Sequence, residues 1–71
     1  MITEQDIKIE NTISPYIYIN RKCVGVWWWD TKTITFDYCL KFFGIDNTQI
    51  VCSRDEIKNK IMERFNKTQK L

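Results

Sequence analysis

The stretch "YIYINRKCVGVWWWDTKTITF", residues 16–36, decides the fold of this chain of 71 residues. It contains three apolar segments rich in β-branched and aromatic residues, separated by polar breaks at 20–22 and 30–32. Such segments are typical of β-strands, and Pro15, directly before them, keeps the residue that precedes it out of the helical region. The sequence therefore predicts a three-stranded antiparallel meander, with strands at about 15–20, 23–29 and 33–36.

The register of this meander determines which of the three consecutive tryptophans lie in the core, because neighbouring side chains of a strand point to opposite faces. A loop of three residues, 30–32, pairs Trp28 with Ile34, and a loop of two residues pairs Ile17 with Val24. We expect this register because it makes one face wholly apolar. The residues of that face are Ile17, Ile19, Val24, Val26, Trp28, Ile34 and Phe36. A slip by one residue in the second hairpin would exchange the two faces.

The opposite face of the predicted meander is the candidate functional surface. It carries Tyr16, Tyr18, Gly25, Trp27, Trp29, Thr33 and Thr35. A glycine inside a strand often marks a β-bulge or the close approach of another backbone. In one interpretation, residues 1–14 or a second copy of the chain cover these aromatic side chains as ordinary core. In the other they form an exposed binding surface, for which Trp and Tyr are enriched residue types.

The C-terminal third of the chain predicts a helix. Ser53 and Glu56 have the spacing of a capping box, and Ile57, Ile61 and Phe65 follow at helical intervals. These signals predict a helix over about 54–66, with residues 67–71 as a frayed tail.

Two shorter elements are expected between the meander and this helix. Asp37 is suited to cap a short helix over 38–43, which Gly44 would close. The apolar segment near 49–52 predicts a fourth strand. Residues 1–14 form either an edge strand or a loose arm.

These elements predict one small α+β domain spanning residues 1–71, in the order β-β-β-α-β-α. Its antiparallel sheet of three to four strands consists of the meander at 15–36 and the short strand near 49–52. The helix at about 54–66 packs on the apolar face of the sheet. The length of the chain also limits it to one domain.

The composition argues against an enzyme. The chain has no His, the commonest general base and a common metal ligand, and its two glycines form no phosphate-binding motif. Its cysteines, Cys23, Cys39 and Cys52, are widely spaced and odd in number, which suits neither a zinc site nor a disulfide framework. We therefore expect no catalytic residues, no cofactor and no metal. Reduced thiols, a polar N-terminus and no long apolar run predict a cytoplasmic protein without a membrane segment.

We expect the chain to be a non-enzymatic protein-binding module, such as an inhibitor or accessory subunit that docks on a larger protein. Small domains without catalytic groups commonly act in this way. The predicted contact residues are Tyr16, Tyr18, Trp27 and Trp29. A homodimer formed through the same face is a further interpretation, and it predicts a mass that depends on concentration.

The alternative is a nucleic-acid-binding module, since aromatic residues on a sheet with basic neighbours are one way to hold single strands. Its phosphate contacts would be Arg21, Lys22, Lys58, Arg64 and Lys67. A helix-turn-helix variant is a second form of this alternative, and it needs a helix rather than a strand through 47–55. The net charge of +2 is compatible with such a function without indicating it.

Overall fold

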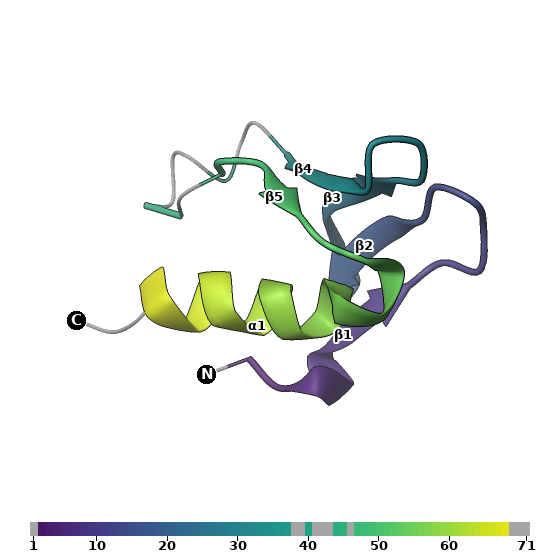
Figure 1. The fold of residues 1–71 in the computed structure, drawn as a ribbon. Helices are drawn as coiled ribbons and strands as arrows, with labels where there is room; N and C mark the ends of the chain where they lie inside the picture. Colours follow the sequence, from purple (N-terminus) through teal and green to yellow (C-terminus); the bar gives the residue numbers. More distant parts are fainter. Residues whose placement is uncertain (1, 38–39, 41–43, 46, 69–71) are drawn as a thin grey trace.

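An antiparallel sheet packed on one face by a C-terminal helix forms the described part of the chain in the computed structural model (Figure 1). That part comprises residues 2–37, 40, 44–45 and 47–68. Within it the sheet has five strands, and each strand pairs with the next in the chain. The strands are β1 (Ile7–Ile9), β2 (Tyr16–Ile19), β3 (Lys22–Trp28), β4 (Thr33–Phe36) and β5 (Ile50–Val51). The α+β class is confirmed, but the sheet has five strands instead of the predicted three to four, because the N-terminal segment supplies an edge strand, β1.

The first hairpin has the predicted two-residue loop but not the predicted register. Asn20 and Arg21 both have positive φ angles, 49° and 72°, as a tight turn matched to the twist of the strands requires. The register then shifts between Ile17 and the residue after it, so that Ile17 lies opposite Gly25. Val24 is therefore the extra residue of a β-bulge, and the predicted pairing of Ile17 with Val24 is wrong.

The second hairpin differs from the prediction by one residue. Trp27 pairs with Ile34, and Trp28 pairs with Thr33, so the connecting loop has four residues instead of three. Lys32, the last residue of that loop, has a φ of 55°. The predicted pairing of Trp28 with Ile34 is therefore wrong. That prediction assigned Trp28 to the core, whereas the observed register places Trp27 there.

The core lies between the inner face of the sheet and the helix α1 (Ile57–Thr68). Ile57, Ile61 and Phe65 of α1 are buried against it, which confirms the helical spacing read from the sequence. The buried apolar residues contributed by the sheet are Ile7, Ile17, Ile19, Val24, Trp27 and Ile34. Phe36, also assigned to this face, is partly buried and its ring centroid lies 6.1 Å from that of Phe65.

The capping box predicted at the start of the helix is confirmed by its hydrogen bonds. A carboxylate oxygen of Glu56 accepts hydrogen bonds from the backbone N–H of Ser53 at 3.2 Å and from its hydroxyl at 3.0 Å. The first turn is a 3-10 helix, η3 (Arg54–Glu56), and α1 continues from it to Thr68, two residues beyond the predicted end.

Two predictions fall on the segment between β4 and α1. The short helix expected over 38–43 lies outside the described residues, apart from Leu40, which is buried. Strand β5 occupies part of the predicted 49–52 strand, and no α-helix is found among the described residues of 47–55. The second helix of a helix-turn-helix is therefore not formed there.

The N-terminal segment is fastened to the C-terminal end of α1. The Asn66 side chain accepts a hydrogen bond from Ile2 N–H at 2.7 Å and donates one to Ile2 C=O at 3.0 Å. A short 3-10 helix, η1 (Glu4–Asp6), then leads into β1. These contacts hold β1 at the edge of the sheet, rather than leaving residues 1–14 as a loose arm.

Candidate functional site

The face of the sheet opposite α1 carries exposed aromatic side chains, and we call it the outer aromatic face. The observed register brings together on it Tyr16, Tyr18, Val26, Trp28 and Thr35. Tyr16 is 51% exposed and Trp28 is 45% exposed, whereas Tyr18, Val26 and Thr35 are half-buried. Exposed aromatic groups of this size on one sheet face are the feature expected of a contact surface.

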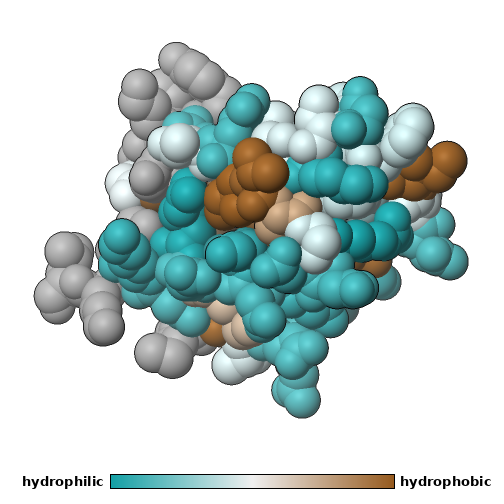
Figure 2. All heavy atoms as spheres, in the orientation of Figure 1, coloured by the Kyte–Doolittle hydropathy of each residue, from teal (hydrophilic) through white to brown (hydrophobic). Residues whose placement is uncertain are grey.

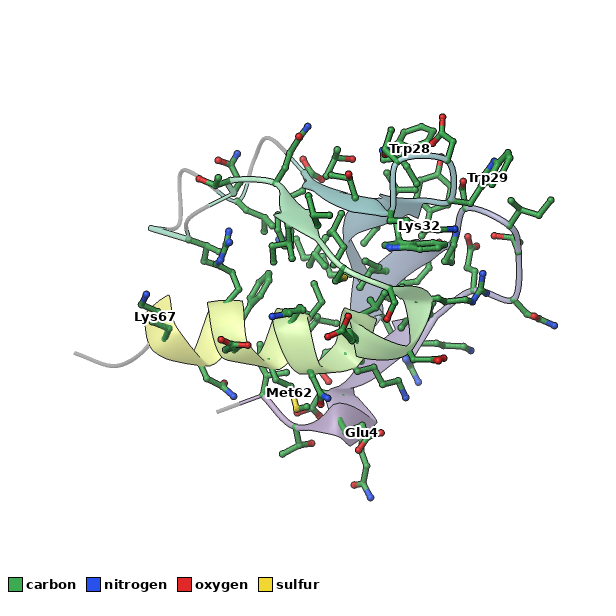
Figure 3. The ribbon with its side chains drawn as sticks, viewed as in Figure 1. Glu4, Trp28, Trp29, Lys32, Met62 and Lys67 are labelled. Atoms are coloured by element: carbon green, nitrogen blue, oxygen red, sulfur yellow. The ribbon has the colours of Figure 1, made fainter. Side chains whose placement is uncertain are left out.

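Trp28 is held in place although it is exposed. Its indole N–H donates a hydrogen bond to the hydroxyl of Thr35 at 2.8 Å. Thr35 lies two residues beyond Thr33, the direct partner of Trp28, so the indole reaches diagonally across β4. Figure 3 shows Trp28 on the far side of the sheet from α1. The hydrogen bond limits the orientations of the ring and leaves its apolar surface available.

Two tyrosines of the face are linked to one carboxylate. Glu10 accepts a hydrogen bond from the backbone N–H of Tyr16 at 3.0 Å and one from the Tyr18 hydroxyl at 3.4 Å. The surroundings of Tyr18 raise its pKa, first through loss of solvation and then through the negative charge of Glu10. Tyr18 therefore stays a neutral hydrogen-bond donor through the physiological pH range.

Trp29 lies next to this face, at the end of β3. Its side chain is 55% exposed, and its backbone N–H donates to the Ser14 hydroxyl at 3.3 Å. Figure 3 shows Trp29 beside the loop that joins β1 to β2, away from α1. Of the four predicted contact residues, Tyr16, Tyr18 and Trp29 are thus at or next to the outer aromatic face.

Trp27, the fourth predicted contact residue, lies in the core with 3% exposure. Its indole N–H donates to the backbone carbonyl of Cys52 at 3.0 Å. The Lys32 ammonium and the Arg54 guanidinium lie 5.3 and 6.0 Å from the centre of its ring. The bulge at Val24 and the longer second loop turn this residue inward. Trp27 contributes stability, and its place on the surface is taken by Trp28.

The basic residues predicted to contact phosphate do not gather at one place. Lys58, Arg64 and Lys67 belong to α1, which covers the inner face, whereas Arg21 and Lys22 adjoin the first hairpin turn. The Arg64 guanidinium donates to Thr48 C=O at 2.8 Å and lies 5.6 Å from the centre of the Phe36 ring. These helix residues therefore lie on the opposite side of the sheet from the outer aromatic face (Figure 1).

Shallow hollows follow one another across the outer aromatic face. The charged side chains that line them are Lys8, Glu10, Arg21, Asp30 and Asp37. Three of these five are acidic and two are basic. The face therefore has an apolar centre and a rim of mixed charge, which is the usual anatomy of a protein–protein interface.

The described residues show two further negative findings. Residues 2–37, 40, 44–45 and 47–68 contain no group of three His, Cys, Asp or Glu side chains placed to hold a metal ion. Within the same residues, α1 and the other helical segments are too short or too polar to span a membrane.

Comparisons of the chain with protein-family models, with curated protein sequences and with solved structures find no match.

Sequence reasoning missed Trp28, Val26 and Glu10 as residues of the outer face. The signal for the first two was Gly25, because a glycine inside a strand is a common mark of a bulge, and a bulge changes which residues share a face. Glu10 had no comparable signal, since its role depends on β1 pairing with β2.

Proposed function

We propose that the chain is a non-enzymatic protein-binding module that docks on a larger protein through the outer aromatic face. The observation that carries the proposal is Trp28, whose indole is 45% exposed and yet fixed by its hydrogen bond to Thr35. A large aromatic group that is already ordered loses little conformational freedom when a partner covers it. Trp and Tyr are also the residue types most enriched among the residues that dominate binding energy.

The charge of the rim favours a protein partner over nucleic acid. The hollows of the face are lined by Glu10, Asp30 and Asp37 against two basic side chains, Lys8 and Arg21. Nucleic-acid binding draws most of its affinity from cations that neutralise phosphates, and three carboxylates would oppose it. The mixed rim instead suits a protein surface that pairs charges of both signs around an apolar centre.

The proposal is tested by comparing the proteins that immobilised wild-type chain and variants retain from a nuclease-treated extract. Trp28→Ser is the test variant, and Ile13→Ser is the matched control, because Ile13 is 69% exposed in a loop away from the centre of the face. We expect a set of proteins that Ile13→Ser retains and that Trp28→Ser loses. Circular dichroism checks that both variants fold.

Three results would count against this function. Equal retention by Trp28→Ser would remove the outer aromatic face as the contact surface. Binding to single-stranded DNA or RNA that weakens steeply with salt would favour the nucleic-acid alternative. A mass that doubles with concentration in wild type and not in Trp28→Ser would show a homodimer that uses this face for itself.

A further inference from the structure

The free edge of β5 and the neighbouring side of α1 form a groove separate from the outer aromatic face. Five strands in chain order leave β5 at one edge of the sheet within the described part of the chain. Val51 of β5 is 76% exposed, the highest value among the large apolar residues that the structure describes. Figure 2 shows a hydrophobic cluster over β5 that is surrounded by hydrophilic side chains.

The backbone of Val51 faces away from the sheet. Cys52 N–H donates to Lys32 C=O at 2.9 Å, which places a ladder hydrogen bond at that pair. Antiparallel ladders alternate, so the next bonded pair is Ile50 with Ile34, and the pair of Val51 with Thr33 between them is not bonded. The N–H and C=O of Val51 therefore point outward, as a template for one more strand.

This edge lacks the features that usually protect an edge strand, apart from its short length. The segment from Gln49 to Cys52 contains no Pro and no charged residue. The opposite edge is different, because β1 carries the exposed Lys8 at its centre and the N–H of Ile7 is already bonded to Glu4 C=O. Charged residues and occupied donors discourage strand addition, and only β1 has them.

The wall of the groove is basic. Ile50, Lys60, Glu63, Arg64 and Lys67 line a hollow of about 210 Å³ between β5 and α1. Three of the four charged side chains are cationic, and the labelled Lys67 marks the far end of this wall in Figure 3. The hollow is smaller than the roughly 300–1,000 Å³ of pockets that enclose small-molecule ligands. It has room for a few side chains of a strand lying along β5.

We propose that β5 accepts an extended segment of a partner protein as an additional strand, with apolar and acidic residues alternating along that segment. Side chains on one face of the added strand would lie beside Val51, which selects apolar groups. Those on the other face would enter the hollow beside Lys60 and Lys67, which selects carboxylates. Main-chain hydrogen bonds supply affinity in this mode of recognition, and the alternate side chains supply specificity.

The test uses a blocked heptapeptide of alternating Val and Glu, titrated into the labelled full-length chain and followed by the chemical shifts of backbone amides. A peptide of alternating Val and Lys is the charge control. We expect the Val–Glu peptide to shift the amides of β5 and of α1 near Lys60, with the shifts weakening as salt is added. The Val–Lys peptide should bind at least about tenfold more weakly, because its charges oppose the wall.

Val51→Pro removes the outward N–H without removing a ladder bond, so an edge strand accommodates it. Val51→Thr, which keeps the N–H and the β-branched shape, is its matched control. We expect about a tenfold loss of peptide affinity in Val51→Pro and less than about a twofold change in Val51→Thr. If Val51→Pro does not fold, a Val–Glu peptide methylated at alternate backbone nitrogens tests the same hydrogen bonds from the other side.

Several outcomes would overturn this inference: equal affinity in Val51→Pro and Val51→Thr, equal binding of the Val–Glu and Val–Lys peptides, amide shifts centred on Trp28, or no binding of the Val–Glu peptide. The inference does not depend on the outer aromatic face. Trp28→Ser should therefore bind the peptide with unchanged affinity even if the proposed function fails.

Discussion

The exchange of roles between two adjacent tryptophans leads to a quantitative prediction for Trp27→Phe and Trp28→Phe. Trp27 is 3% exposed, and replacing it with Phe leaves Cys52 C=O without its donor and removes part of a buried ring. An unpaired buried acceptor costs about 1–3 kcal/mol, and the lost volume adds to that cost. We expect Trp27→Phe to lower the free energy of unfolding by about 2–4 kcal/mol.

The same substitution at Trp28 should cost much less. Trp28 is 45% exposed, and its hydrogen bond to Thr35 lies at the surface, where water replaces either partner. The loss should be about 0.5–1 kcal/mol. A chain of this length has a total stability of about 4–10 kcal/mol, so only the first variant approaches the limit of folding.

Urea unfolding followed by far-ultraviolet circular dichroism separates the two variants. With a slope of about 1 kcal/mol/M for so small a domain, Trp27→Phe should lower the midpoint by roughly 2–4 M and Trp28→Phe by less than about 1 M. The native Trp28→Phe variant should also keep the blue-shifted fluorescence of the buried Trp27 indole, and the Trp27→Phe variant should lose it. A midpoint shift in Trp28→Phe as large as that in Trp27→Phe would refute the observed register.

Three further perturbations test other parts of the structure. Gly25→Ala should lower the free energy of unfolding by about 1–3 kcal/mol in urea titration, because the added Cβ collides with the Thr35 carbonyl oxygen. Hydrogen bonds from Ser53 lower the pKa of Glu56 below its ordinary value of 4.5. The ionised carboxylate therefore stabilises the fold at a pH above 4.5, and this stabilisation is lost as the pH falls below that value and the carboxylate is protonated. The difference in urea midpoint between wild type and Glu56→Gln should therefore shrink from pH 6 to pH 3. Burial raises the pKa of the Cys52 thiol, so less of it is present as the reactive thiolate in the native chain. Iodoacetamide at pH 8 should therefore modify Cys52 more slowly in the native chain than in urea, and mass spectrometry of peptides would measure the two rates.

Local sequence signals predicted the helix and the approximate positions of the strands. The recurrence of Ile57, Ile61 and Phe65 needs only the geometry of a helix, and the Ser53–Glu56 pair acts within one turn. The two-residue turn at 20–21 was also local, because it is set by the polar break between two apolar segments. Each of these elements is determined by residues close together in the chain.

The register could not be predicted in the same way, because it depends on how separate strands pack. An inner face containing Val26 and Trp28 and one containing Trp27 are similarly apolar, so hydrophobicity alone does not separate them. What separates them is the bulge at Val24, which places Val24 and Gly25 both on the buried side. A bulge of this kind is specified by contacts across three strands, including the approach of Thr35 to Gly25.

The bulge also determines what the surface offers to a partner. The bulge at Val24 brings Trp28 onto the same face as Tyr16 and Tyr18, and the four-residue second loop sets Trp28 in a row with Thr33 and Val51, from β3 across β4 to the edge of β5. A strand added along β5 would continue this row, placing one of its apolar side chains beside Val51 and three strands from Trp28. The outer aromatic face would bind a partner through side chains, and the edge of β5 would bind one through main-chain groups. The two surfaces are nevertheless adjacent in space. A partner that presents an apolar surface and an alternating acidic strand would engage both, and its affinity for a Trp28→Ser and Val51→Pro double variant should be lower than for either single variant, because neither linked contact then remains intact.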